Sequence, residues 1–402
     1  MMVPPYMMTM RTLEALLAVM LLSTCSLSGC TFLETPDSST EVTAIFSLTP
    51  SSNVQVGQEV EVDASSSLPS DGSLTYRWDF DGDGQSDESG VSATWTYLEA
   101  EEVTIELTVS DGTNRDTRSV DLTIFEASVS PPAADAGSGG SEADCDEESI
   151  DSTTYYLVYL CEMDQSSSDR NVDGTVDVEL DGSGSTSRNT GGYVAQWAWD
   201  LDLQTDTDGD GDTENDADLT GERPTWQGVQ PGEYDIALTV EDENGMTAKD
   251  EVTVFVNYVG LWSDMDIGPN RTSGAPTIEF TFPVAYDRDS GNTIRKAEVI
   301  LSYPEQDDDW IVGSNSEQNR NRLDLHAQNE DGDDVRNTTD AAPDDRNAGD
   351  CDEDEDDCVL LLLSSFMFSD TQHGDGEWTV EVKNERRNDV TDIRVRIDLV
   401  YK

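Results

Sequence analysis

The sequence predicts an all-β protein made of successive β-sandwiches, and three observations support this. Apolar residues recur at every second position in several segments, for example at Val103, Ile105, Leu107 and Val109. Turn-forming residues separate these segments, and part of the pattern occurs twice along the chain. Alternation with a period of two between turns is typical of antiparallel strands that bury one face, so sandwiches are expected rather than helical bundles.

The composition allows several folded domains and excludes one class of partner. The chain has 402 residues, with 86 Asp and Glu against 22 Lys and Arg, and its formal net charge is −64. A surface of this charge repels phosphate groups, so nucleic acid is not expected as a partner. Hydrophobic residues make up 35% of the chain and include eight Trp, which is enough for several small cores.

The N-terminal residues have the pattern of an export signal. The apolar run at 15–22 is shorter than the roughly 20 residues that a membrane-spanning helix needs. The tetrad at 27–30, Leu-Ser-Gly-Cys, resembles the lipobox of bacterial lipoproteins. The resemblance implies that residues 1–29 are removed, that Cys30 is acylated and that residues 30–40 form a linker. An ordinary secretory signal is the alternative. We therefore expect a lipid-anchored protein of the bacterial cell envelope, at the outer membrane or cell surface rather than the inner membrane.

Four cysteines remain beyond this N-terminal region. In an oxidising compartment they are expected to form disulfides, and their proximity in sequence favours Cys145 with Cys161 and Cys351 with Cys358. A zinc site is the alternative, but these cysteines lack paired Cys-x-x-Cys spacing and have no nearby His.

An internal repeat indicates two copies of one fold. The segment 107–111, Leu-Thr-Val-Ser-Asp, returns almost unchanged at 238–242, and the same distance separates Trp95 from Trp226. Trp is expected in the cores of these sandwiches rather than against a ligand, because each buried indole contributes roughly 150–250 Å² of burial. The tryptophans concerned are Trp78, Trp95, Trp199 and Trp226.

These residues resemble the PKD family of immunoglobulin-like β-sandwiches. In the first copy the resemblance is carried by the small-residue turn at 63–67, by Trp78-Asp79-Phe80 and by the strand at 103–111. The second copy has the matching segments 181–185 and 231–234, but carries a longer acidic insert after its Trp-Asp pair. The resemblance implies a PKD-like domain at 41–125 and a second PKD-like domain at 145–257. The segment between them, 126–144, is rich in Pro, Gly, Ala and Ser, which predicts a flexible linker.

The remaining residues, 258–402, also alternate in the manner of strands, and a final strand is expected at 393–401. The stretch 376–382 and the following Asn388-Asp389 are similar to the end of the P domain, a jelly roll that follows the catalytic domain of subtilisin-like convertases. The resemblance implies a jelly-roll-like C-terminal sandwich. An unrelated sandwich is the alternative.

Two acidic loops place carboxylates at alternate positions with Gly between them, which favours a calcium ion, because Ca²⁺ takes six to eight oxygen ligands. Neither loop has the Glu that closes a helix-loop-helix calcium site. The alternative is an acidic surface adapted to salt. The candidate ligands are Asp79, Asp81, Asp83 and Asp87 in the first loop and Asp206, Asp208, Asp210 and Asp212 in the second.

No catalytic motif is recognisable, and the only two His, His326 and His373, lie in none. We therefore expect no enzyme but a lipid-anchored binding or adhesion protein, stabilised by calcium, whose tandem sandwiches display a C-terminal domain that binds a protein or a glycan. One alternative is an accessory component that attaches a secreted protease or carbohydrate-degrading system to its substrate. Another is an undetected hydrolase within 259–402.

Overall fold

The all-β prediction is confirmed by a computed structural model of the chain. Among the described residues, regular structure is β-strand apart from the short 3-10 helix η3 (Ser365–Phe368), and no helix there is long and apolar enough to cross a membrane. The chain forms two compact units, the first holding most of 42–122 and the second the rest. The described residues are 42–70, 73–140, 145–146, 154–207, 213, 216–268, 274–288, 291–304, 323–339, 356–384 and 391–402.

The first sandwich has one sheet of order β1-β3-β6 and a second of order β2-β8-β7-β4-β5. On β7 all four alternating apolar side chains are buried, as the period of two predicts. Trp78 of β4 is fully buried and meets the ring of Phe46 edge-on at 5.1 Å. The strands are β1 (Ser47–Thr49), β2 (Val54–Gln55), β3 (Glu59–Asp63), β4 (Thr75–Asp79), β5 (Glu88–Ser89), β6 (Ser92–Thr96), β7 (Glu102–Ser110) and β8 (Arg115–Phe125).

The second sandwich repeats this plan, with β13-β12-β15-β16 in one sheet and β11-β14 in the other. Its core is centred on Trp199, which is fully buried and packs among aliphatic side chains such as Leu238. The strands are β9 (Gly139–Gly140), β10 (Tyr156–Gln165), β11 (Val176–Glu179), β12 (Val194–Asp200), β13 (Leu219–Thr220), β14 (Thr225–Val229), β15 (Gly232–Asp242) and β16 (Thr247–Ile267).

Part of the segment expected as a flexible linker, 126–144, packs against the second sandwich. Ala133 forms a β-bridge with Thr186, and Ala136 is buried and accepts a hydrogen bond of 2.8 Å from the Tyr156 hydroxyl. The Ala136 amide donates to Asp250 at 2.8 Å. The small residues that suggested a linker thus allow the chain to lie close along the sandwich.

The C-terminal sandwich is a jelly roll. Its sheets have the orders β16-β23-β18-β21 and β17-β22-β19-β20, which is the order that a jelly roll requires. The closing strand β23 agrees with the expected final strand. The new strands are β17 (Thr277–Val284), β18 (Lys296–Pro304), β19 (Leu323–Gln328), β20 (Asp334–Asn337), β21 (Asp356–Ser364), β22 (Gly376–Asn384) and β23 (Thr391–Val400).

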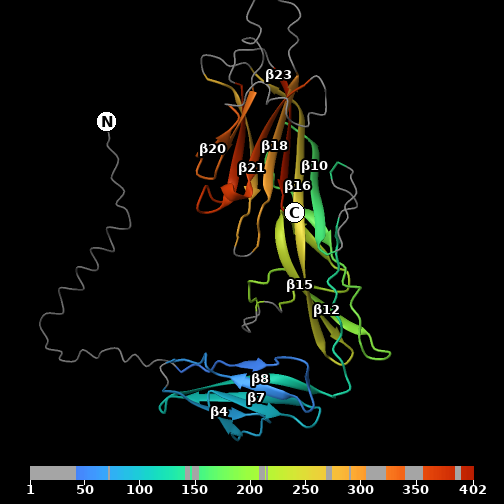
Figure 1. The fold of residues 1–402 in the computed structure, drawn as a ribbon, viewed down its shortest axis with the longest axis vertical. Coiled ribbons are helices and arrows are strands. Elements are labelled where there is room, and N and C mark those ends of the chain that lie inside the picture. Colours follow the sequence, from blue (N-terminus) through green and yellow to red (C-terminus); the bar gives the residue numbers. More distant parts are fainter. Residues whose placement is uncertain are drawn as a thin grey trace, which may run out of the picture. The chain divides into compact units, whose positions relative to one another are not determined.

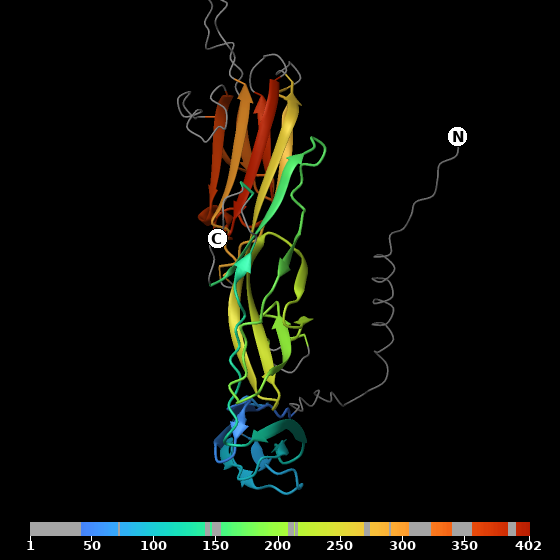
Figure 2. The same cartoon turned by 90° about the vertical axis from the view of Figure 1, so that its right-hand side faces the viewer.

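Strand β16 joins the second sandwich to the jelly roll without a break (Figure 1). Its first half pairs with β15 up to Val256, and its second half pairs with β23 from Tyr258 onward. Along its other edge, β10 runs parallel to it from Val254 to Trp262, which spans the junction. The domain boundary expected between 257 and 258 therefore lies inside one strand, whose path Figure 2 shows in yellow.

Asn257 lies on β16 between the residues that pair with β15 and those that pair with β23, and it is only 1% exposed. Its side-chain oxygen accepts hydrogen bonds from the backbone amides of Tyr401 at 2.8 Å and Lys402 at 3.3 Å. The side-chain amide thus replaces a missing strand partner, which keeps the buried polar groups satisfied where the two ladders meet.

The expected disulfide between Cys145 and Cys161 is present, with the two Cα atoms 5.6 Å apart. Cys161 lies on β10 opposite Val259 of β16, so the bond fastens the preceding segment to the shared sheet. Next to it, Arg396 of β23 donates two hydrogen bonds of 2.7 Å to Asp146 and holds the pKa of that carboxyl below its usual value. Cys358 is also disulfide-bonded.

Candidate functional site

The first acidic loop folds around Asp79, the last residue of β4. Asp79 is 7% exposed, and its two carboxylate oxygens accept hydrogen bonds from the amides of Gly82 at 2.8 Å and Gly84 at 2.7 Å. Both glycines have positive φ angles, of 70° and 82°, which a residue with a Cβ rarely adopts. The glycines therefore let the loop turn back over the carboxylate.

Three carboxylates meet in this loop. Asp79, Asp81 and Asp87 each place an oxygen within 4.8 Å of the others. Asp87 also accepts a hydrogen bond of 2.8 Å from the amide of Phe80. Asp83 is not part of the cluster, and its carboxylate accepts hydrogen bonds from the backbone and the side chain of Gln85. The structure thus brings together three of the four candidate ligands in this loop.

The second sandwich repeats this framework at residues that the sequence interpretation did not single out. The amide of Leu201 donates to Asp218 at 2.8 Å, as that of Phe80 does to Asp87. Asp200 takes the place of Asp79 and is 4% exposed. Its Oδ2 is buried without a hydrogen-bond partner among the described residues, and burial, followed by the charges of Asp218 and Asp216, raises its pKa.

The other candidate residues are only partly described. Asp206 lies after β12, where the neighbouring Thr207 amide donates to Asp216 at 2.7 Å. The remaining candidate residues lie outside the described part of the chain, namely Asp208, Asp210, Asp212, Cys30 and Cys351.

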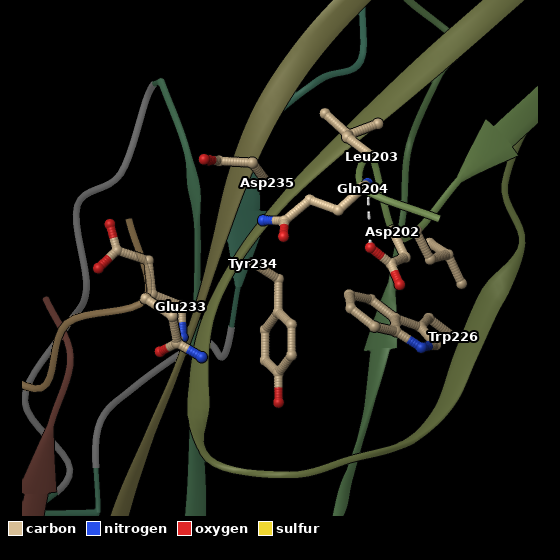
Figure 3. Close-up of a pocket in the computed structure, with 9 residues that line it drawn as sticks. Asp202, Leu203, Gln204, Trp226, Glu233, Tyr234 and Asp235 are labelled. Carbon is tan, nitrogen blue, oxygen red and sulfur yellow. Dashed lines mark hydrogen bonds between the residues drawn. The ribbon is translucent and has the colours of Figure 1, made fainter. Parts of the chain in front are cut away.

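A groove with a volume of about 420 Å³ lies in the second compact unit (Figure 3). Trp226 of β14 and Tyr234 of β15 are its aromatic residues, and their ring centroids are 5.3 Å apart at an angle of 77°. Both rings pack against the core of the second sandwich and remain half-buried. The other lining residues are Leu201, Asp202, Leu203, Gln204, Glu233, Asp235 and Asn292.

Contacts within the groove fix its polar side chains. Glu233 accepts hydrogen bonds from the backbone amide and the hydroxyl of Thr293, at 3.2 and 3.3 Å. Its own amide donates to the side-chain oxygen of Asn292 at 3.3 Å. These contacts link the first residues of β15 to the segment between β17 and β18, so the second sandwich and the jelly roll both contribute to the groove.

The sequence interpretation did not identify this groove. Its expectation that the recurring tryptophans lie in cores holds fully for Trp78 and Trp199, whereas Trp95 and Trp226 are only half-buried. Alternation in sequence tells which residues face inward, but not which inward-facing side chain lies at the rim of a sheet. A signal was present in the Trp226 and Tyr234 pair, yet the sequence alone does not show that the two rings meet.

Comparisons with known proteins agree with this fold. Residues 43–125 match a family model described as PKD domain, and residues 166–256 match a second family model that is likewise described as a PKD domain. The prediction of tandem PKD domains is therefore confirmed, and such domains fit a non-catalytic binding role. None of the curated protein sequences matches the chain.

Several solved β-proteins are similar to parts of the chain. The PKD1 domain of the Vibrio cholerae metalloprotease PrtV is 31% identical and covers 21% of this chain and 98% of its own, with a TM-score of 0.18. SGBP-B of the Bacteroides ovatus mixed-linkage glucan utilization locus is 12% identical and covers 86% and 94%, with a TM-score of 0.16. A SusE-like surface located polysaccharide binding protein from Bacteroides thetaiotaomicron is 12% identical and covers 69% and 44%, with a TM-score of 0.19.

Proposed function

We propose that this chain, with its two PKD domains in tandem, is a non-catalytic binding protein that a lipid on Cys30 anchors in the bacterial cell envelope. The observation that carries the binding role is the groove at Trp226 and Tyr234. Its residues come from the second PKD domain and from the jelly roll, which share one sheet. Glu233, Tyr234 and Asp235 lie on β15 of this sheet, and hydrogen bonds join Glu233 to Asn292 and Thr293. This wall of the groove is therefore ordered before a ligand arrives, which reduces the entropy lost on binding.

Replacement of Cys30 by alanine tests the anchoring. We expect the native chain to incorporate radiolabelled fatty acid and to sediment with membranes, because acylation requires the thiol of Cys30. The Cys30→Ala chain should lose both the label and the membrane association. Cys25→Ala is the matched control and should keep both, since this residue precedes the predicted cleavage site. Equal labelling and sedimentation of the Cys30→Ala chain would contradict the proposal.

Calcium is proposed as the stabilising ion of the first PKD domain. Its support is the donor set of Asp79, Asp81 and Asp87, whose oxygens converge within 4.8 Å. Carboxylate oxygens are hard ligands of the kind that Ca²⁺ prefers, and three such charges repel one another unless a cation lies between them. Asp79 and Asp87 are already fixed by backbone amides, so little further ordering is needed for binding.

Asp81→Asn and Asp83→Asn separate calcium binding from general acidity, because both remove one charge from the same loop but only Asp81 belongs to the cluster. An affinity near 10⁻⁴ M, in the range of extracellular sites, gives about 2.7 kcal/mol of stabilisation when Ca²⁺ is in 100-fold excess over its Kd. We expect the native chain and Asp83→Asn to show this gain in calorimetric melting. Asp81→Asn should lose most of it.

Sodium chloride at matched ionic strength is the reference for this measurement, because screening alone also stabilises an acidic chain. A gain from calcium no larger than that from sodium, or equal gains in the two variants, would contradict a calcium site at Asp79, Asp81 and Asp87.

A further inference from the structure

We infer that the groove at Trp226 and Tyr234 binds a neutral oligosaccharide. The inference rests on the proposed binding function and adds to it the site and the class of ligand. It stands on three features of the groove, which are its fixed aromatic pair, its set of hydrogen-bonding side chains and its charge.

The aromatic pair is held in place before any ligand binds. A Cβ on Gly232 would lie 2.8 Å from the ring of Tyr234, so the ring folds over this glycine in a position that another residue would block. The Tyr234 hydroxyl donates to the carbonyl of Gln230 at 3.0 Å, and burial raises the pKa of the phenol. The ring therefore stays neutral and fixed, and together with Trp226 it offers apolar surface to the C–H face of a sugar ring.

The polar side chains suit a ligand that is rich in hydroxyl groups. Glu233, Asp202 and Asp235 accept hydrogen bonds, while the amides of Gln204 and Asn292 can both donate and accept. Glu233, Tyr234 and Trp226 all line the groove, and in the view of Figure 3 Tyr234 lies between the other two. Sugar hydroxyls can donate to carboxylates while the ring packs on the aromatic residues, and such charge-assisted hydrogen bonds are the stronger kind.

The charge of the groove decides which oligosaccharides fit. Among the described lining residues there are three carboxylates and no Lys, Arg or His. A uronic acid or a sulfated sugar would add like charge in a partly desolvated space, which is unfavourable. The volume of about 420 Å³ lies in the range of small-molecule sites, roughly 300–1,000 Å³, and a short sugar segment fits it better than a folded partner does.

The test uses residues 31–402 as one soluble chain, an array of neutral oligosaccharides, uronic-acid oligosaccharides, chitosan fragments and lysine-rich peptides, and calorimetric titration of whatever is retained. We expect retention of at least one neutral oligosaccharide and of no uronic-acid oligosaccharide. Trp226→Ala and Tyr234→Ala should each weaken its binding at least tenfold, and Trp226→Phe should recover part of the loss. Tyr193→Ala removes a 63% exposed aromatic residue of the same sandwich outside the groove and should bind like the native chain.

Each contrary outcome identifies what fails. If no neutral oligosaccharide is retained, or if only chitosan fragments or lysine-rich peptides are, the inferred ligand class is wrong. If a neutral oligosaccharide binds equally well to Trp226→Ala with its melting temperature unchanged, the site is wrong while the binding function stands. If the native chain binds glycan but is neither acylated nor membrane-bound, the anchoring fails and the groove assignment stands.

Discussion

Replacing Trp199 with alanine is expected to lower the free energy of unfolding by about 3–5 kcal/mol, because the substitution leaves a large cavity in a close-packed core. Trp199 is fully buried, and its indole nitrogen donates to the carbonyl of Gly221 at 3.0 Å. The ring also lies so close to Gly182 that a Cβ there would be 3.2 Å from it. The loss therefore combines missing burial, a missing hydrogen bond and an empty volume.

Denaturant unfolding followed by circular dichroism measures this effect. Tyr193→Ala is the matched control, since it removes a 63% exposed aromatic residue next to the same strand and should change stability by less than about 0.5 kcal/mol. A loss below about 1 kcal/mol for Trp199→Ala would show that this tryptophan is not the centre of the core.

Removal of the Cys145–Cys161 disulfide is expected to cost about 3 kcal/mol. The two cysteines are 16 positions apart in the sequence, and closing a loop of about this length lowers the conformational entropy of the unfolded chain by that equivalent. The bond also holds the segment that carries Asp146 beside Arg396. Without the disulfide, the Arg396–Asp146 ion pair remains to hold this segment. Because both partners are partly exposed, the ion pair alone contributes little to stability.

The double variant Cys145→Ser, Cys161→Ser is preferable to chemical reduction, because a reductant would also open the disulfide of Cys358. Denaturant unfolding of this variant against the native chain gives the difference directly. Arg396→Gln serves as a control that disturbs the same segment without changing the loop, and we expect a smaller loss from it. Equal stability of the double variant and the native chain would show that the Cys145–Cys161 disulfide does not stabilise the fold.

The strands and the order of the three sandwiches could be predicted because alternating burial leaves a clear pattern in the sequence. Val103 to Val109 and the closing strand are examples, since each exposes polar residues between buried ones. The continuity of β16 could not be predicted in this way. Asn257 and Gly260 interrupt its apolar pattern, and only the structure shows that the Asn257 side chain binds the end of the chain.

Gly260 has a similar explanation. A Cβ at this position would lie 2.4 Å from the Tyr258 hydroxyl and 2.7 Å from the ring of Trp262. The two large side chains lie on the same face of β16 and meet over the glycine. A residue that reads as a strand breaker in the sequence is thus required by packing inside the strand.

The candidate sites were predictable only in part, for geometric reasons. Alternate carboxylates suggested that Asp83 joins Asp79 and Asp81, but the turn at Gly82 and Gly84 directs backbone amides toward Asp79 and leaves Asp83 beside Gln85. In the second sandwich the Trp-Asp pair already matched Asp200 to Asp79, but the long acidic insert separates Asp200 from Asp218. The equivalence of Asp218 to Asp87 is therefore visible only in the hydrogen bonds. The groove draws on residues from several distant segments, which no local pattern connects.

We infer that the second PKD sandwich and the jelly roll fold as one unit around β16. Amide hydrogen exchange of the Trp199→Ala chain can test this claim, since Trp199 packs only in the core of the second sandwich among the described residues. We expect faster exchange not only on β12 but to a similar extent on β17 and β22, which form the far sheet of the jelly roll. Faster exchange confined to the second sandwich, with β17 and β22 protected as in the native chain, would contradict the claim.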